Sequence, residues 1–139
     1  MSPADLKLRA RRLIEEVLNQ GDLAVVTELM SPTCTHHIPG GELAPGLASL
    51  RDWLSRTHRI FPDFHAIVED EFVAGDQVAQ RITAYGTHAA TGRPVEFACL
   101  HIIRAGPDGR FTEHWATADL LAALGQLSAG VQYALARRR

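Results

Sequence analysis

The spacing of apolar residues changes along the chain, and this change constrains the fold more than any other feature. In the first 60 residues, apolar side chains recur at helical intervals, as Leu13, Val17 and Leu54 illustrate. From Phe64 onward the period falls to two, which is typical of strands with one covered face. Helices followed by an antiparallel meander predict an α+β fold, with N-terminal helices packed on one face of a curved antiparallel or mixed sheet.

Capping and turn residues predict where these elements begin and end. Ser2 and Pro3 start a helix that Gly21 ends, and Asp22 caps a short second helix that Ser31 and Pro32 end. Further helices are expected at residues 47–60 and 119–127, and the sequence leaves the tail after Ser128 unassigned; residues 129–139 of this tail lie outside the residues described below. Strands are expected at residues 33–38, 64–74, 77–88, 95–104 and 110–117, with residues 39–46 as a loop.

The length of 139 residues suits one domain, so residues 1–139 are treated as a single domain. A curved sheet covered by helices forms a cone, and the hollow inside it is where a small ligand is expected. The uncovered sheet face must also be buried, and homodimerisation is the usual solution.

Composition and missing motifs exclude several classes of partner. A net charge of -2 argues against nucleic acid and anionic membrane surfaces, and no apolar run reaches the length of a membrane span. The N-terminus is too charged for a signal peptide, and the widely separated Cys34 and Cys99 suit a reducing compartment, so a cytoplasmic location is expected. No nucleotide-binding glycine motif, HExxH or CxxC is present, so no cofactor and no metal site are expected.

Seven histidines make proton transfer the chemistry to consider first, because the unperturbed pKa of histidine lies near neutrality. In the strand at 95–104, His101 shares one face with Cys99 and apolar residues, so it is either a satisfied core group or a pocket group. Alternation turns only one of His36 and His37 inward, and the sequence does not decide which.

Asp119 has two possible roles at the junction of the last strand and the last helix. Aspartate is a favoured helix N-cap, so one interpretation is that Asp119 only caps the last helix. It is equally interpretable as a carboxyl at the mouth of the hollow, where an apolar wall including Trp115 would raise its pKa and make it a usable acid or base. Trp53 and Phe61 are expected in the core or the pocket wall.

Short motifs in a fixed order resemble the SnoaL-like polyketide cyclases over about residues 10–127. The motifs are Asn19-Gln20-Gly21-Asp22-Leu23, His37-Ile38-Pro39, Phe61-Pro62-Asp63, Gly86-Thr87-His88, Thr91-Gly92-Arg93-Pro94-Val95, and Asp108-Gly109-Arg110 with Glu113-His114-Trp115 and Asp119. The resemblance implies the cone-shaped α+β barrel of nuclear transport factor 2 and a homodimer. The loop His88-Ala89-Ala90 is shorter than in many members, which implies a differently shaped pocket rim.

The resemblance also implies an activity, namely cofactor-independent, intramolecular aldol-type ring closure of a polyketide or a related small hydrophobic carbonyl compound. Asp119 matches the general acid/base of the family and His101 its pocket histidine, with His37 as a further catalytic candidate. The candidate substrate-binding residues are Trp53, Phe61, Cys99, Trp115 and His36.

Other functions remain open at this point. One is a limonene-type epoxide hydrolase, although the Arg-x-Asp pair that such an enzyme needs is missing at positions 99 and 101. Another is a ketosteroid-isomerase-like enzyme. The third is a non-catalytic small-molecule-binding or dimerisation module, in which Asp119 is only a cap and His101 only a core group.

Overall fold

A computed structural model describes residues 1–128 and confirms the α+β class. The elements in chain order are α1 (Pro3–Arg12), the π-helical segment η1 (Leu13–Asn19), α2 (Leu23–Leu29), β1 (Met30–Ile38), β2 (Gly41–Leu43), α3 (Leu47–Ile60), β3 (His65–Ala74), β4 (Gln77–Thr87), β5 (Pro94–Ala105), β6 (Phe111–Ala118) and α4 (Leu120–Leu127). The change of apolar period therefore marks the boundary between α3 and the long strands, as predicted. No helix within residues 1–128 combines the length and the apolar character needed to cross a bilayer.

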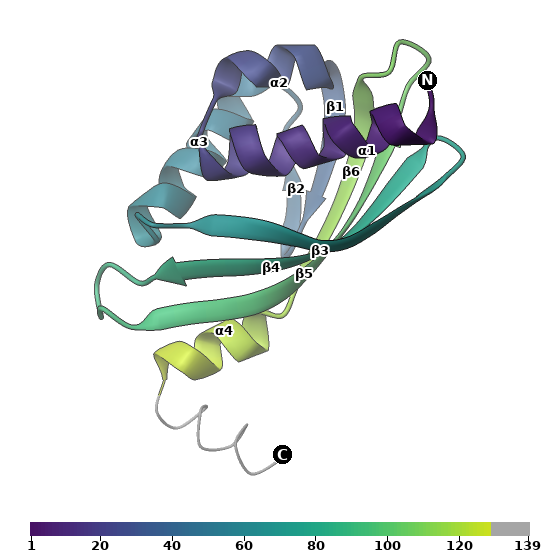
Figure 1. Cartoon of the computed structure of the whole chain (residues 1–139). Coiled ribbons are helices and arrows are strands. Elements are labelled where there is room, and N and C mark those ends of the chain that lie inside the picture. The colour runs from purple at the N-terminus through teal and green to yellow at the C-terminus, as the bar shows by residue number, and fades with distance from the viewer. Residues whose placement is uncertain (129–139) are drawn as a thin grey trace.

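The six strands form one open, mixed sheet in the order β2-β1-β6-β5-β4-β3. All neighbours are antiparallel except β1 and β6, which run parallel. Figure 1 shows α1, α2 and α3 together on one side of the curved sheet, while α4 lies beside the end of β5. The inner face of the sheet is the one that looks toward α1, η1 and α3, and everything that positions the site lies on it.

The region between α2 and α3 differs from the sequence prediction. Residues 39–46 were expected to form only a loop, but Gly41–Leu43 add the short strand β2 to the end of β1. Gly40 has a φ of 88°, which permits the tight turn between the two strands. Strand β1 also begins at Met30 rather than Thr33, and Pro32 is tolerated within it because the pairing register shifts between Met30 and Thr35.

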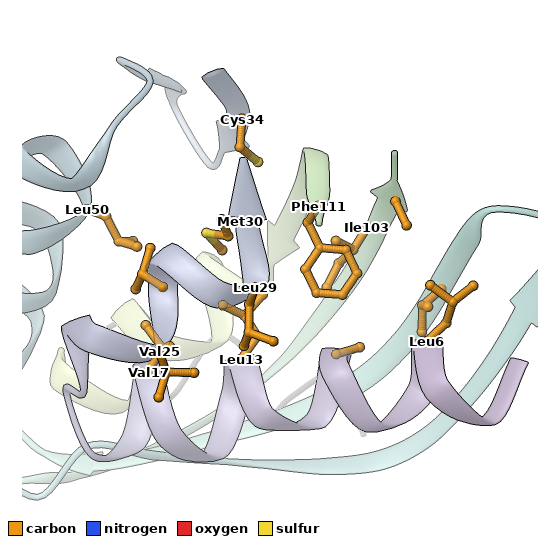
Figure 2. Close-up of a cluster of buried hydrophobic side chains, with 14 of the residues drawn as sticks. Leu6, Leu13, Val17, Val25, Leu29, Met30, Cys34, Leu50, Ile103 and Phe111 are labelled. Atoms are coloured by element: carbon orange, nitrogen blue, oxygen red, sulfur yellow. The ribbon is translucent and has the colours of Figure 1, made fainter. Parts of the chain in front are cut away.

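The N-terminal helix is fixed at its start by reciprocal capping and along its length by burial. The Asp5 amide donates to Ser2 Oγ at 3.1 Å, and the Ser2 amide donates to Asp5 Oδ2 at 3.0 Å, which forms a capping box. Figure 2 shows Leu13, Leu29 and Phe111 gathered between the helices and the strands. This core occupies one part of the inner face and leaves space farther along the sheet for a cavity.

The outer face of the sheet carries large apolar side chains on β3 and β5 that residues 1–128 leave uncovered. Side chains that alternate with the buried ones include Ile67 and Phe72 of β3, and Leu100 and Ile102 of β5. Their exposed fractions run from 43% to 64%, which is high for large apolar groups on long strands. This outer apolar face is the uncovered surface that the sequence analysis anticipated.

Gly86 lies on β4 where Phe61, the residue that ends α3, packs closely against the strand. A Cβ atom at position 86 would stand 2.9 Å from the Phe61 Cβ. We expect Gly86→Ala to lower the free energy of unfolding by about 1–3 kcal/mol, because either Phe61 or the strand must shift. Urea unfolding followed by circular dichroism measures the change.

Thr83→Ala, on the outer face of the same strand, is the matched control for this substitution. We expect it to cost less than about 1 kcal/mol, since only strand propensity changes there. Equal effects at the two positions would contradict the proposed packing of Phe61 on Gly86.

Candidate functional site

A cavity of about 290 Å³ lies between the helices and the inner face of the sheet. Its helical wall includes Val17 and Leu18 of η1 and Trp53 and Thr57 of α3, and Phe61 adds to the wall where α3 ends. The sheet contributes the alanines Ala66, Ala84, Ala116 and Ala118 together with larger side chains such as Phe97. Among residues 1–128, no Asp, Glu, Lys or Arg lines this cavity. The space therefore suits a small, mainly apolar molecule.

Three histidines supply most of the polar atoms in the cavity wall, and strand register brings them together. His36 of β1 lies opposite His114 of β6, while His101 of β5 lies opposite Ala116, two residues farther along β6. His36 Nδ1 is 3.3 Å from His114 Nδ1, and His114 Nε2 is 3.2 Å from His101 Nδ1. The three rings thus form a continuous hydrogen-bonded row, here called the imidazole row (His36, His114, His101).

Burial holds the imidazole row in its neutral form. Loss of hydration lowers the pKa of His101 to about 4. Burial also lowers the pKa of His36, with a smaller contribution from His37, and it takes the pKa of His114 well below its ordinary value. At pH 7 each ring therefore carries one N–H donor and one bare acceptor nitrogen, which are the groups needed for transfer of a proton within an apolar space.

Three other predicted site residues also line the cavity. Trp53, Phe61 and Cys99 are in its wall together with His36, so the structure brings these side chains and His101 around one space. Burial raises the pKa of the Cys99 thiol to about 11, which leaves it protonated at neutral pH. Cys99 is therefore a wall residue here and is not poised as a nucleophile.

Asp119 occupies the capping position rather than the cavity wall. Its Oδ1 accepts a hydrogen bond from the Ala122 amide at 3.0 Å, and the residue is exposed. Ala118 and Leu120, on either side of it, do line the cavity, so Asp119 stands at the mouth with its carboxyl turned to the start of α4. Of the two roles open from the sequence, this geometry supports the cap.

His37 and Trp115 lie on the outer face, which corrects the prediction that both belong to the pocket. His37 is hydrogen-bonded at 2.9 Å from Nε2 to Glu113 Oε1 and from Nδ1 to Glu42 Oε1. The bond to Glu113 raises the pKa of His37, and its ring stacks on Trp115 with centroids 5.5 Å apart. Since neighbouring residues of a strand face opposite ways, placing His36 inside necessarily places His37 outside.

His114 is the functional candidate that sequence reasoning missed, and a bulge in β6 explains why. Phe111 pairs with Ala105 and faces inward, but the next paired residue, Glu113, lies opposite Arg104 and faces outward. Thr112 is therefore an extra residue in β6, and it reverses the alternation beyond it. A strict period of two from Phe111 would turn Trp115 inward, whereas the bulge turns His114 inward instead.

The described residues offer no evident metal centre. Within residues 1–128, no group of three or more His, Cys, Asp or Glu side chains is arranged to hold a metal ion. The imidazole row does not supply one either, because its ring nitrogens point at one another in series rather than at a common point.

Comparison with known proteins gives a consistent result. The sequence model of the SnoaL-like polyketide cyclases matches residues 8–127, and no curated protein sequence matches the chain significantly. Among solved structures, IdmH from Streptomyces antibioticus, described as a candidate polyketide cyclase, is 32% identical with a TM-score of 0.79, over 88% of this chain and 97% of that one.

Two further structures mark the range of this similarity. AclR from Streptomyces galilaeus, described as a candidate hydroxylase, is 25% identical with a TM-score of 0.78, over 91% of this chain and 97% of that one. A protein from Catenulispora acidiphila with a ketosteroid isomerase-like fold is 18% identical with a TM-score of 0.74, over 85% of this chain and 90% of that one. The last comparison concerns the fold alone.

The neutral state of His101 predicts a dependence of stability on pH. The unfolded chain binds a proton at this residue below about pH 6.5, whereas the folded protein does so only below about pH 4. Stability is therefore lost as the pH falls through this window, and the His101 share of the loss is about 3 kcal/mol.

Urea unfolding of the wild type and of His101→Gln, each at pH 7 and at about pH 4, measures how much of the loss of unfolding free energy on acidification comes from His101. The glutamine does not titrate, so we expect the variant to lose less stability on acidification by about that amount. Equal losses in the two proteins would show that His101 is protonated in the folded state as readily as in the unfolded state.

Proposed function

This chain belongs to the SnoaL-like polyketide cyclase family, and from that premise we propose that it closes a ring in a small carbonyl compound by cofactor-independent proton transfer. The observation that carries the proposal is a set of hydrogen-bonded neutral imidazoles inside an otherwise apolar cavity. Buried polar groups without a structural need are unusual, and their convergence on a ligand-sized space favours acid–base chemistry.

The cavity favours a compact, mainly apolar substrate. Its volume of about 290 Å³ lies at the lower end of the usual range for ligand sites. Trp53, Phe61 and Phe97 offer flat apolar surfaces to a conjugated carbonyl chain, and no charged side chain among residues 1–128 faces it. A polyketide or a related small carbonyl compound fits this description.

His101 is the residue that we propose to move the proton. Its Nδ1 is engaged by His114, and its Nε2 has no hydrogen-bond partner among residues 1–128, which leaves Nε2 for the ligand. In the tautomer with a bare Nε2, His101 removes a proton from a carbon next to a carbonyl group. The enolate carbon then bonds to a second carbonyl carbon of the same molecule, and the protonated His101 returns the proton to the new alkoxide.

Asp119 is a second candidate base, because it stands between Ala118 and Leu120 at the mouth of the cavity. It would have to release the Ala122 amide before its carboxyl turned toward a ligand. Two isosteric or near-isosteric substitutions separate the candidates: His101→Gln removes the imidazole, and Asp119→Asn removes the charge while asparagine remains an equally good cap.

A suitable probe is nitrobenzisoxazole, a small apolar carbon acid that opens to a coloured phenolate when a base removes its proton. We expect the wild type to accelerate the opening, His101→Gln to lose about 10²–10⁴-fold of kcat/KM, and Asp119→Asn to stay within about threefold of the wild type. Absorbance at saturating and limiting probe concentrations gives both constants.

The outcomes of this assay assign the base. The reverse pattern, with activity lost in Asp119→Asn and kept in His101→Gln, would move the base to Asp119. Binding without any acceleration by the wild type would favour the non-catalytic binding module. Binding is read independently from the fluorescence of Trp53 in a Trp115→Phe background, because Trp53 lines the cavity and Trp115 lies outside it.

We also propose that the outer apolar face pairs two copies of the chain. Ile67 of the edge strand β3 and Leu100 and Ile102 of β5 supply apolar surface. Arg81, on β4 between them, and Glu96 place both signs of charge on the same face. A two-fold axis through such a surface can bring opposite charges together while covering the apolar side chains.

The oligomeric state in sedimentation velocity tests this pairing. We expect the wild type to sediment as a dimer and Leu100→Glu as a monomer, because a carboxylate at the centre of the interface would be desolvated. Leu8→Glu is the matched control, since Leu8 is equally exposed on α1, far from the outer face, and the dimer should persist. A monomeric wild type, or a dimeric Leu100→Glu, would refute the pairing.

The cytoplasm is the location that we propose for the protein. Cys34 and Cys99 are both free, as expected in a reducing compartment. Burial raises the pKa of each thiol to about 11, which also slows their oxidation.

A further inference from the structure

His36 borders two cavities rather than one. Besides the main cavity, a second pocket of about 140 Å³ lies between α2, β1 and the start of α3, with Thr27, Ser31 and Arg110 in its wall. His36 belongs to the walls of both spaces, whereas His101 and His114 belong only to the first. The imidazole row thus begins at the main cavity and ends beside the second pocket.

The hydrogen bonds of the row are linked because His114 is engaged at both of its ring nitrogens. A neutral imidazole has one N–H, so His114 must donate to one neighbour and accept from the other. When His114 donates to His36, it accepts from His101, and His101 Nε2 is bare. When His114 accepts from His36, it donates to His101, and His101 Nε2 carries a proton. The state of Nε2 in the cavity is therefore coupled to His36.

We propose that the imidazole row is a proton relay, through which a proton taken up by His101 in the main cavity moves its charge to His36 beside the second pocket. The inference rests on the proposed function, because it gives His114 and His36 a part in the proton transfer of the same reaction. Both are positioning residues for His101 and do not themselves contact the substrate carbon.

The relay conserves protons at every step. The substrate C–H bond breaks, its electron pair stays on carbon as the enolate, and the proton binds His101 Nε2. His101 passes its Nδ1 proton to His114 Nε2, and His114 passes its Nδ1 proton to His36 Nδ1. His36 then carries the positive charge, and the reverse sequence returns the proton to the alkoxide.

The surroundings of the imidazole row explain why positive charge would move from His101 to His36. The helices packed over the cavity, η1 and α3, contribute only uncharged lining residues, and Cys99 is the remaining titratable group in the cavity wall within residues 1–128. A cation at His101 would therefore have no counter-charge. At the other end, Arg110 is the charged residue in the wall of the second pocket, while Glu113 and His37 lie on the opposite face of the sheet. Arg110 opposes a cation at His36, but Thr27 and Ser31 bring hydroxyl groups into the wall of the second pocket and give His36 polar neighbours on that side.

The first test is independent of turnover. Isotope-labelled histidine rings are titrated by nitrogen-detected NMR in the wild type and in His114→Phe. We expect His36, His101 and His114 of the wild type to report one common midpoint, because they share one proton, and His36 and His101 to titrate separately once His114 is replaced. Separate midpoints in the wild type would overturn the relay.

The second test is chemical rescue of His36→Ala with the nitrobenzisoxazole probe. We expect kcat to fall about tenfold or more with KM within about twofold, and free imidazole to restore most of the rate by occupying the vacated space. Pyrrole is the matched control, because it has the same size and an N–H but no basic nitrogen, so it should restore nothing.

The variants also distinguish failure of the relay from failure of the proposed function. If His101→Gln abolishes turnover and His36→Ala does not, the relay is wrong and the proposed base stands. If neither variant lowers turnover, His101 is not the base and the relay fails with it. If the wild type does not accelerate the reaction at all, the proposed function itself fails. Restoration of His36→Ala by pyrrole would assign His36 a purely structural role.

Discussion

The pairing of β1 with β6, combined with the bulge at Thr112, is the constraint on which the site depends. Parallel pairing sets His36 opposite His114, and the bulge decides that His114 rather than Trp115 faces the helices. If the same sequence paired without the bulge, the inner face of β6 would carry Glu113 and Trp115 in place of His114. The hydrogen-bonded row, and with it the proposed chemistry, follows from this local irregularity of one strand.

The same sheet gives neighbouring histidines opposite electrostatic environments. On the inner face, burial favours neutral rings, so the pKa of His36 is lowered. On the outer face, hydrogen bonds to Glu113 and Glu42 favour the charged ring, so the pKa of His37 is raised. A single step along β1 therefore separates a buried neutral imidazole from a surface ion pair, which explains why residue type alone cannot assign roles to such residues.

The fold was predictable because it rests on averaged patterns, and the site was only partly predictable because it rests on exceptions to them. The helical and alternating periods, the cap at Ser2 and the turns located α1, α3 and the long strands. The same alternation placed His101 and Cys99 on one face of their strand. It could not choose between His36 and His37, nor find His114, because those answers need the parallel register of β1 and β6 and a bulge without a strong local sequence signal.

The alanines of the sheet wall carry a consequence for the evolution of this architecture. Ala66, Ala84, Ala116 and Ala118 border the cavity from β3, β4 and β6, so part of its capacity depends on side chains that are only methyl groups. Enlarging one of them removes room for the ligand, and none of the four belongs to the packed core around Phe111. Substitutions at these positions can thus change the size of the ligand that related proteins accept, while the main core continues to provide the stability of the fold.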